Sequence, residues 1–274
     1  MTHSSTSKYL IGAIIAAVVV SAPLLLIMSL NQMPNSEIKL TLLYNDGAMI
    51  EANGVRIYID PLYIPSNYSD LPADVILITH SHSDHYSLSD IQDIETDDTL
   101  FVCPAIMTEA IERHNGLGVN PGDSFLVGDI NVTAFHLYMP DYPHELPSSH
   151  PKEANWTSYI IEIDGFKIFH AGDAKYMAEL EELTGTIDVA FLPIYFDGGY
   201  GALNESLLPT VGATDILQPR YVIPMHYVDP NLEIFMSEYS ILIENTDCEI
   251  LALPYFTSFT FLKIQNGYSL ELSI

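Results

Sequence analysis

The sequence predicts an α/β protein whose main domain is a four-layer αββα sandwich, in which two sheets pack face to face and helices cover both outer faces. Two observations indicate this fold. Strand-like segments gather in two blocks, near residues 38–59 and 124–169, and each block is followed by strands that alternate with helices. In addition, residues of the types that bind metals follow several predicted strands, and open sheets place their sites at strand ends.

The first block begins with antiparallel strands. Residues 38–43 and 55–59 have the pattern of strands, and Asn53-Gly54, just before the second of them, is a strong hairpin signal. The spacing of Ser87 and Asp90 is that of a capping box, which predicts the start of a helix. The further elements expected in this half are strands at 75–78 and 100–103 and helices at 88–94 and 105–113.

A long loop lies beside the second block. Residues 139–156 are rich in proline, histidine, serine and acids without any period, and long ordered loops are more often functional than not. Residues 158–163 and 166–169 then form a hairpin around Gly165. The remaining elements expected are strands at 124–127, 131–135, 187–193, 221–224, 249–252, 256–264 and 268–274, and helices at 176–183, 211–217 and 232–244.

The N-terminal segment predicts a membrane anchor. Residues 9–30 carry no charged side chain, and about 20 apolar residues cross a bilayer as a helix. A cleavable signal peptide is the alternative, although Ser21-Ala22, the nearest small-residue cleavage site, is followed by proline and more apolar sequence. We therefore expect a single-pass membrane protein with an extracytoplasmic domain, since Lys8 precedes the span. The expected organisation is a tail at 1–8, the transmembrane anchor at 9–30, a linker at 31–37 and the main domain at 38–274.

The charge balance bears on the partners of the protein. Aspartate and glutamate number 36 and lysine and arginine 9, so the net charge is -27. Nucleic-acid binding requires clustered basic residues, so no nucleic-acid partner is expected. A small anionic molecule could still be received by local cations, including bound metals. Cys103 and Cys248 form no C-x-x-C pair, which predicts neither a disulfide framework nor thiolate zinc, and the oligomeric state is not indicated.

One motif concentrates metal-binding chemistry. His80-Ser81-His82-Ser83-Asp84-His85 has the form H-x-H-x-D-H and follows the apolar strand at 75–78. Imidazole nitrogens and carboxylate oxygens suit a borderline cation such as zinc, and a turn that leaves a strand can aim several of them at one point. A histidine-rich surface loop is the alternative, but ten histidines in 274 residues make this clustering improbable by composition. The motif therefore predicts a metal site.

Three later donors, His136, Asp173 and His226, also stand at the ends of predicted strands. With the histidine motif, their order resembles that of the metallo-β-lactamase superfamily. Within that superfamily the chain is similar to the ascorbate-6-phosphate lactonase-like group of metal-dependent hydrolases. The resemblance covers about residues 38–253 and is carried further by Ile59-Asp60-Pro61, His150-Pro151-Lys152, Tyr159-Ile160-Ile161-Glu162, Phe169-His170-Ala171-Gly172-Asp173 and Ile223-Pro224-Met225-His226-Tyr227.

The resemblance implies two divalent metal ions, zinc first and manganese or iron as alternatives. His80, His82 and His136 would bind one ion and Asp84, His85 and His226 the second, while Asp173 would bridge both. Two cations can hold a hydroxide between them and polarise a substrate oxygen, so no serine or cysteine nucleophile is required. Asp84 and Asp173 are the residues expected to be catalytic, the former by orienting the water or passing a proton.

Substrate contacts are less defined than the metal ligands. His150 and Lys152 could contact an anionic or leaving group, and Tyr200 lies in a glycine-rich loop at 197–202. That loop, and Ala174 where the group commonly has threonine, depart from the pattern of the resembled group, which leaves the substrate open. The expected function is a membrane-anchored zinc hydrolase that opens an ester, lactone or related bond in a small anionic molecule. The alternatives are a metal-dependent phosphodiesterase, with a phospholipid as one substrate, and a non-catalytic metal-binding membrane protein.

Overall fold

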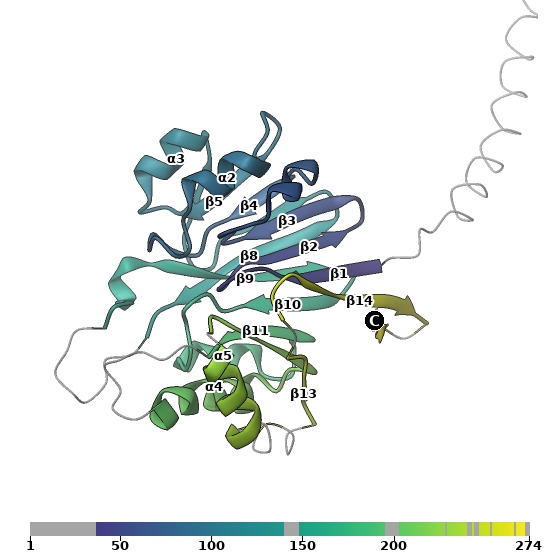
Figure 1. Cartoon of the computed structure of the whole chain (residues 1–274). Coiled ribbons are helices and arrows are strands. Elements are labelled where there is room, and N and C mark those ends of the chain that lie inside the picture. The colour runs from purple at the N-terminus through teal and green to yellow at the C-terminus, as the bar shows by residue number, and fades with distance from the viewer. Residues whose placement is uncertain are drawn as a thin grey trace, which may run out of the picture. The chain divides into compact units, whose positions relative to one another are not determined.

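The computed structural model describes residues 37–139, 148–194, 203–227, 229–239, 243, 247–252, 254–265 and 267–271. These residues form two sheets (Figure 1). The first sheet has the strand order β15-β14-β1-β2-β3-β4-β5-β6. Its strands are β1 (Glu37–Leu42), β2 (Ala48–Ala52), β3 (Val55–Ile59), β4 (Val75–Leu77), β5 (Leu100–Pro104), β6 (Leu117–Val119), β14 (Thr257–Ile264) and β15 (Gly267–Glu271).

The second sheet has the order β13-β12-β11-β10-β9-β8-β7. Its strands are β7 (Ser124–Val127), β8 (Ile130–Leu137), β9 (Trp156–Ile163), β10 (Phe166–His170), β11 (Val189–Pro193), β12 (Tyr221–Met225) and β13 (Glu249–Ile250). Both sheets are mixed, because β1, β2 and β3 pair antiparallel before the parallel run β3 to β6, and β7 to β10 pair antiparallel before the parallel run β10 to β13.

Helices cover the outer faces of the two sheets. Figure 1 shows α2 (Leu88–Ile94) and α3 (Thr108–His114) beside the first sheet, and α4 (Leu203–Leu217) and α5 (Asp229–Ile234) beside the second. Short 3-10 helices lie at Ser66–Asp70, Lys152–Ala154 and Ala178–Leu183, and a π-helical turn at Phe235–Tyr239. The arrangement is the predicted αββα sandwich of the metallo-β-lactamase type.

Two hydrophobic layers account for this arrangement. The main core joins the facing sides of the two sheets, with Leu40 and Ile57 from the first sheet and Ile161 and Ile168 from the second, all buried. A separate cluster packs the first sheet against α2 and α3 and includes Ile76, Ile91 and Phe101. The main core also includes Ala213 and Leu217 of α4, so the two clusters together connect all four layers of the sandwich. Burial of apolar surface contributes roughly 25 cal/mol per Å² to this packing.

Local signals explain why several elements were predictable. Asn53 and Gly54 have φ of 52° and 78°, as the tight turn between β2 and β3 requires. At the start of α2 the Ser87 hydroxyl donates to Asp90 Oδ2 at 2.5 Å, and the Asp90 amide donates to Ser87 Oγ at 3.5 Å. This is a variant of the capping box, in which Asp90 accepts from the Ser87 hydroxyl instead of the Ser87 amide.

Other elements differ from expectation. The helix expected at 105–113 starts only at Thr108, because the Met107 amide donates to the Pro104 carbonyl in a turn that precedes the helix. Strand β6 is not among the elements expected from the sequence. A Cβ on Gly118 would lie 2.7 Å from Ile111 Cδ1 and 3.1 Å from Ala105 Cα, so the glycine permits close packing beneath α3.

The predicted single-pass membrane localisation is wrong. In the part of the chain that the structure describes, no helix is both long and apolar enough to span a bilayer. The tail at 1–8, the anchor at 9–30 and residues 31–36 of the linker lie outside the described residues, and Glu37 is the first residue of β1.

Candidate metal centre

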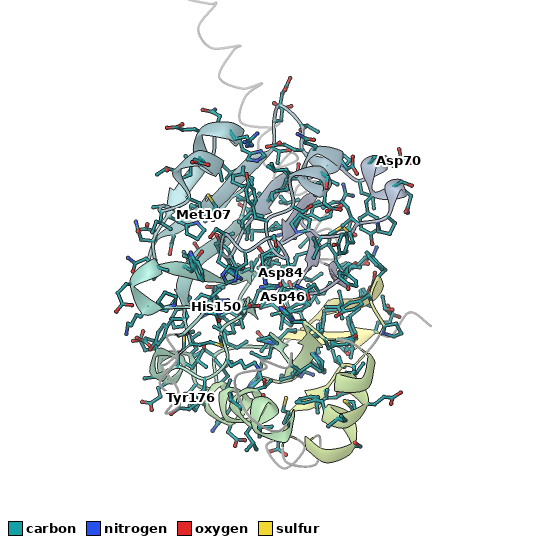
Figure 2. All side chains as sticks on the ribbon, turned by 60° about the vertical axis from the view of Figure 1, so that its left-hand side comes forward. Asp46, Asp70, Asp84, Met107, His150 and Tyr176 are labelled. Atoms are coloured by element: carbon teal, nitrogen blue, oxygen red, sulfur yellow. The ribbon has the colours of Figure 1, made fainter. Side chains whose placement is uncertain are left out.

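The candidate metal centre is built from loops at the ends of five strands. His80, His82 and His85 follow β4, Asp173 follows β10 and His226 follows β12. Asp46 lies in the turn between β1 and β2, and His150 in the segment before β9. In Figure 2 the labelled side chains Asp46, Asp84 and His150 lie in the middle of the domain.

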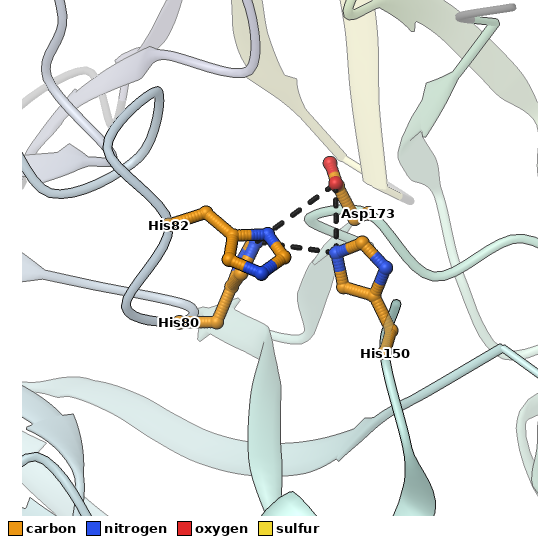
Figure 3. A group of neighbouring side chains, drawn as sticks. All are labelled: His80, His82, His150 and Asp173. Atoms are coloured by element: carbon orange, nitrogen blue, oxygen red, sulfur yellow. Dashed lines mark hydrogen bonds and ion pairs between the residues drawn. The ribbon is translucent and has the colours of Figure 1, made fainter. Parts of the chain in front are cut away.

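The first group of donors consists of His80, His82, His150 and Asp173 (Figure 3). His80 Nε2 is 3.0 Å from His82 Nδ1 and 3.3 Å from His150 Nε2. Asp173 Oδ2 is 2.9 Å from His150 Nε2 and 3.8 Å from His80 Nε2. Four ligands held about 2.0 to 2.1 Å from one zinc ion in a tetrahedron would be roughly 3.3 Å apart, so the spacing of these atoms fits such an ion.

The second group consists of Asp46, His85, Asp173 and His226. Both carboxylate oxygens of Asp46, Nε2 of His85 and Oδ1 of Asp173 are buried without a hydrogen-bond partner. His85 Nε2 and Asp173 Oδ1 are 3.2 Å apart, and His226 Nε2 is 3.4 Å from the same oxygen. Buried polar atoms that converge without hydrogen bonds are costly, so this donor set fits a second cation.

Outer contacts select the ring nitrogen that each histidine presents. Thr79 Oγ1 donates its single proton to Asp60 Oδ2 at 2.5 Å, so His80 Nδ1, 2.9 Å from that hydroxyl oxygen, is the donor to it. His85 Nδ1 lies 2.9 Å from Asp60 Oδ2 and donates to it. In the neutral form of each ring, Nε2 is therefore the nitrogen that carries the lone pair, and it faces the centre. Asp60 orients the ligands, because its Oδ1 also accepts the Thr79 amide at 2.8 Å.

His170 links the loops that carry the two carboxylates. Its Nε2 donates to the Asp46 carbonyl at 2.7 Å, and its Nδ1 accepts the Gly172 amide at 3.2 Å. Gly172 has φ of 54°, and a Cβ there would lie 2.7 Å from Leu137 Cδ1 and 3.0 Å from Thr79 Cβ. The left-handed glycine is thus needed for Asp173 to turn into the centre.

Burial and neighbouring charges set the protonation of the centre. Burial lowers the pKa of His80 well below its usual value and also lowers that of His82, which favours the neutral imidazole that binds metals. Burial opposes the charged form of His85, but Asp173, Asp60 and Asp46 raise the pKa of this ring well above its usual value. Burial likewise opposes ionisation of Asp173, yet His85 and His226 hold its pKa well below the usual range.

The structure brings together most, but not all, of the residues expected from the sequence. His80, His82, His85, Asp173 and His226 lie in the two groups. His136 does not; it is half-buried in β8, where it faces Thr157 of β9 in the strand register. His150, expected to contact substrate, occupies the place among His80, His82 and Asp173 that was expected of His136.

Three other expectations change in the structure. Asp84 is outside the donor groups, with a side chain 49% exposed and Oδ2 3.5 Å from His226 Nε2. The hydrogen bond from His226 lowers the pKa of Asp84. Lys152 Nζ lies 2.5 Å from Glu179 Oε1 instead of being free for substrate, and Tyr200 is outside the described residues.

Asp46 was missed by sequence reasoning. Asn45-Asp46-Gly47 has the composition of a turn, and Asn45 does adopt φ of 58°. A Cβ on Gly47 would lie 2.9 Å from the Tyr44 carbonyl oxygen and 3.2 Å from that of Asp60. The turn therefore packs closely against the loop after β3, and this packing places Asp46 at the centre. The composition of the turn alone does not reveal this placement.

Comparison with known proteins agrees with the fold. Residues 39–226 match the family model described as a beta-lactamase superfamily domain. A UPF0173 metal-dependent hydrolase of Thermococcus onnurineus is 36% identical over 190 residues, which is 63% of this chain and 77% of that protein. A UPF0173 metal-dependent hydrolase of Pyrococcus furiosus is 32% identical over 210 residues, 69% of this chain and 84% of that protein.

A solved structure shows the same fold. The metallo hydrolase Igni18 of Ignicoccus hospitalis aligns with a TM-score of 0.62 at 23% identity, covering 84% of this chain and all of that chain. Together with these relatives, the paired donor groups identify a metal-dependent hydrolase. The chain belongs to the metallo-β-lactamase superfamily. Its similarity to the ascorbate-6-phosphate lactonase-like group stays a prediction.

Proposed function

We propose that the protein is a dinuclear zinc hydrolase that opens an ester, lactone or related carbon–oxygen bond in a small anionic molecule. The observation that carries this proposal is the position of Asp173. Its Oδ2 belongs with the three histidines of the first group, and its Oδ1 faces His85 and His226 of the second. One carboxylate that faces two donor groups is suited to bridge two ions.

The donor chemistry favours zinc. The first group offers three imidazoles and one carboxylate, and the second offers two of each. Imidazole-rich sites suit zinc, whereas the carboxylates of the second group would also accept manganese or iron. When bound, such ions polarise the substrate carbonyl and make water nucleophilic near neutral pH.

The residues of the chain supply the remaining steps. Asp84 stands beside His226 at the solvent side of the second group, where its carboxylate can accept a proton from the attacking water and return it to the departing oxygen. The two cysteines do not compete as nucleophiles, because burial raises the pKa of Cys103 and of Cys248 to about 12.

The test is hydrolysis by the full zinc-loaded chain across panels of lactones, carboxylic esters, phosphodiesters and β-lactams. We expect turnover of lactones or esters that carry an anionic group. Preferential cleavage of the phosphodiesters would contradict the carbon–oxygen assignment and favour displacement at phosphorus.

In Asp84→Asn we expect kcat to fall by about 100-fold or more with zinc content unchanged, since positioned general bases contribute a rate factor of about 10² to 10⁴.

A further inference from the structure

Three tyrosine rings pack together beside the candidate metal centre, and two of them are exposed. The Tyr44 ring lies 5.3 Å from that of Tyr63, at 60°, and 5.1 Å from that of Tyr255, at 50°. Tyr63 is 70% exposed and Tyr44 37% exposed. We call these three side chains the tyrosine platform. Adjacent exposed apolar side chains, unlike single ones, can mark a ligand site.

Short stretches of chain and hydrogen bonds connect the platform to the donor residues. Tyr44 precedes Asp46 by two residues, a span of at most about 7 Å. The Tyr255 hydroxyl donates to the Tyr227 carbonyl at 2.8 Å and accepts the Tyr227 amide at 3.1 Å, directly after His226. The His226 amide in turn donates to the Asn45 carbonyl at 2.9 Å. The platform and the second donor group therefore form one connected piece of structure.

The platform stands where the second donor group meets solvent. Asp84 is the half-exposed carboxylate beside His226, and its carbonyl accepts a hydrogen bond from Asn45 Nδ2 at 3.2 Å. Asn45 follows Tyr44 in the chain. A molecule whose reacting bond lies at Asp84 and His226 is thus bound beside residues that connect directly to the platform.

Three residues around the platform have left-handed backbone conformations. Tyr63 has φ of 47°, Asn45 of 58° and His226 of 53°. The left-handed region is uncommon for residues other than glycine, and rare for a bulky one such as Tyr63. Such conformations persist where surrounding contacts impose them, and they cluster at ligand sites. At Tyr63 this conformation accompanies a ring that is held against Tyr44 and remains largely exposed.

From these observations we infer that the tyrosine platform binds a planar aromatic group in the non-reacting part of the substrate. This inference rests on the proposed function and adds a substrate class to it. Aromatic rings stack on one another in offset or edge-to-face geometry, which suits the tilted faces of Tyr44 and Tyr63. A neutral ring also meets no repulsion from a chain of net charge -27.

The test measures binding of phosphonates to the full zinc-loaded chain by calorimetry. Each probe carries a phenyl ring one, two or three carbons from the phosphonate and is paired with the alkyl phosphonate that lacks the ring. We expect one ring-bearing probe to bind at least about threefold to tenfold more tightly than its partner, as one aromatic pair allows. Tyr63→Ala should abolish that preference and leave the alkyl phosphonate unchanged, whereas Tyr63→Phe should keep it.

Leu126→Ala is the matched control, because Leu126 is 71% exposed on β7 and is not part of the platform. Equal binding of both members of every pair, or a preference that survives Tyr63→Ala, would overturn the inference while leaving the hydrolase proposal intact. Failure of all phosphonates to bind would defeat both. If light scattering showed a wild-type dimer that Tyr63→Ala dissociates without loss of a ring preference, the platform would be a subunit contact and the inference wrong.

Discussion

At the scale of single residues, each buried histidine of the centre uses one ring nitrogen for the protein and presents the other to the metal. Thr79 and Asp60 take the Nδ1 protons of His80 and His85, and the Ser149 hydroxyl lies 2.9 Å from His150 Nδ1. Such outer contacts fix ring orientation and tautomer before a metal arrives. The orientation of these three histidines is therefore set by their contacts with Thr79, Asp60 and Ser149.

The clearest prediction at the residue scale is which histidine belongs to the first donor group. We expect His150→Ala to weaken binding of one of two zinc ions by more than about 100-fold, because even outer contacts cost about 10- to 100-fold in affinity. His136→Ala, a matched change on β8, should keep both ions. Zinc titration can be followed by fluorescence, since Trp156 is the single tryptophan and its ring lies 4.8 Å from that of His80 and 5.4 Å from that of His150. Loss of an ion in His136→Ala and not in His150→Ala would contradict the assignment.

The residues that sequence reasoning misplaced have a common cause. His136 lies in β8 and His150 shortly before β9, and their order along the chain does not say which side chain reaches His80, 56 and 70 residues earlier, respectively. Asp46 was interpreted as a turn former because ligands and turn formers draw on the same residue types. In contrast, the H-x-H-x-D-H spacing is local, and local spacing was enough to find the centre.

At the scale of elements, the segment that carries His150 is held in place by three interacting side chains, Tyr138, Lys152 and Glu179, which we call the strap. Lys152 Nζ lies 2.5 Å from Glu179 Oε1, the Tyr138 hydroxyl donates to Glu179 Oε2 at 2.5 Å, and the ammonium lies 4.8 Å from the Tyr138 ring centre. The Met139 amide also donates to the His150 carbonyl at 2.9 Å. The strap thus joins the end of β8, the 3-10 turn after His150 and the turn after Asp173.

We expect Glu179→Gln to weaken zinc binding at the first group severalfold, and the effect to shrink in 1 M salt because exposed ion pairs are screened. Burial raises the pKa of Glu179, but Lys152 and Tyr138 bring it down to about 2. Because the pKa of Glu179 is depressed, its ionised form contributes stability above the usual pKa of 4.5, and this stability is lost as pH falls toward about 2. The strap should therefore be intact throughout a neutral assay. The measurement is zinc affinity at low and high salt, and a salt-independent effect would argue against the ion pair.

The turn after β10 gives a stability prediction. Gly172→Ala should destabilise the fold by about 1 to 3 kcal/mol and lower zinc occupancy, because the new Cβ meets Leu137 and Thr79 at positive φ. Gly165→Ala is the control, since Gly165 has φ of 84° but open space around it, and we expect only about 1 kcal/mol there. Urea unfolding measures both. Equal losses would mean that backbone strain alone, and not crowding beside Asp173, sets the cost.

Elements were predictable where their signals are local. The hairpin at Asn53-Gly54 and the capping box of α2 depend on neighbouring residues and were found. Strand β6 has three residues including Gly118, and its existence depends on pairing with β5 and packing under α3. Such a strand is stabilised by tertiary contacts, which propensity cannot anticipate.

At the scale of the whole molecule, the αββα order follows from the sequence of strand blocks, whereas the metal centre is a product of topology. The mixed sheets bring the ends of β4, β10 and β12 to one place, together with the turn after β1 and the segment before β9. No single stretch of chain contains both groups. The net charge of -27 adds a further consequence, because self-repulsion in the folded state falls as salt screens it.

The central claim is that Asp173 joins two metal sites, and zinc stoichiometry tests it most directly. After removal of metal by chelation and reconstitution of the full chain, calorimetric titration should find two zinc ions per chain in wild type. Asp173→Ala should hold at most one ion tightly and lose turnover, since both groups lose a ligand. A wild-type chain that binds one zinc or none, or an Asp173→Ala chain that still binds two with unchanged affinity, would contradict the account.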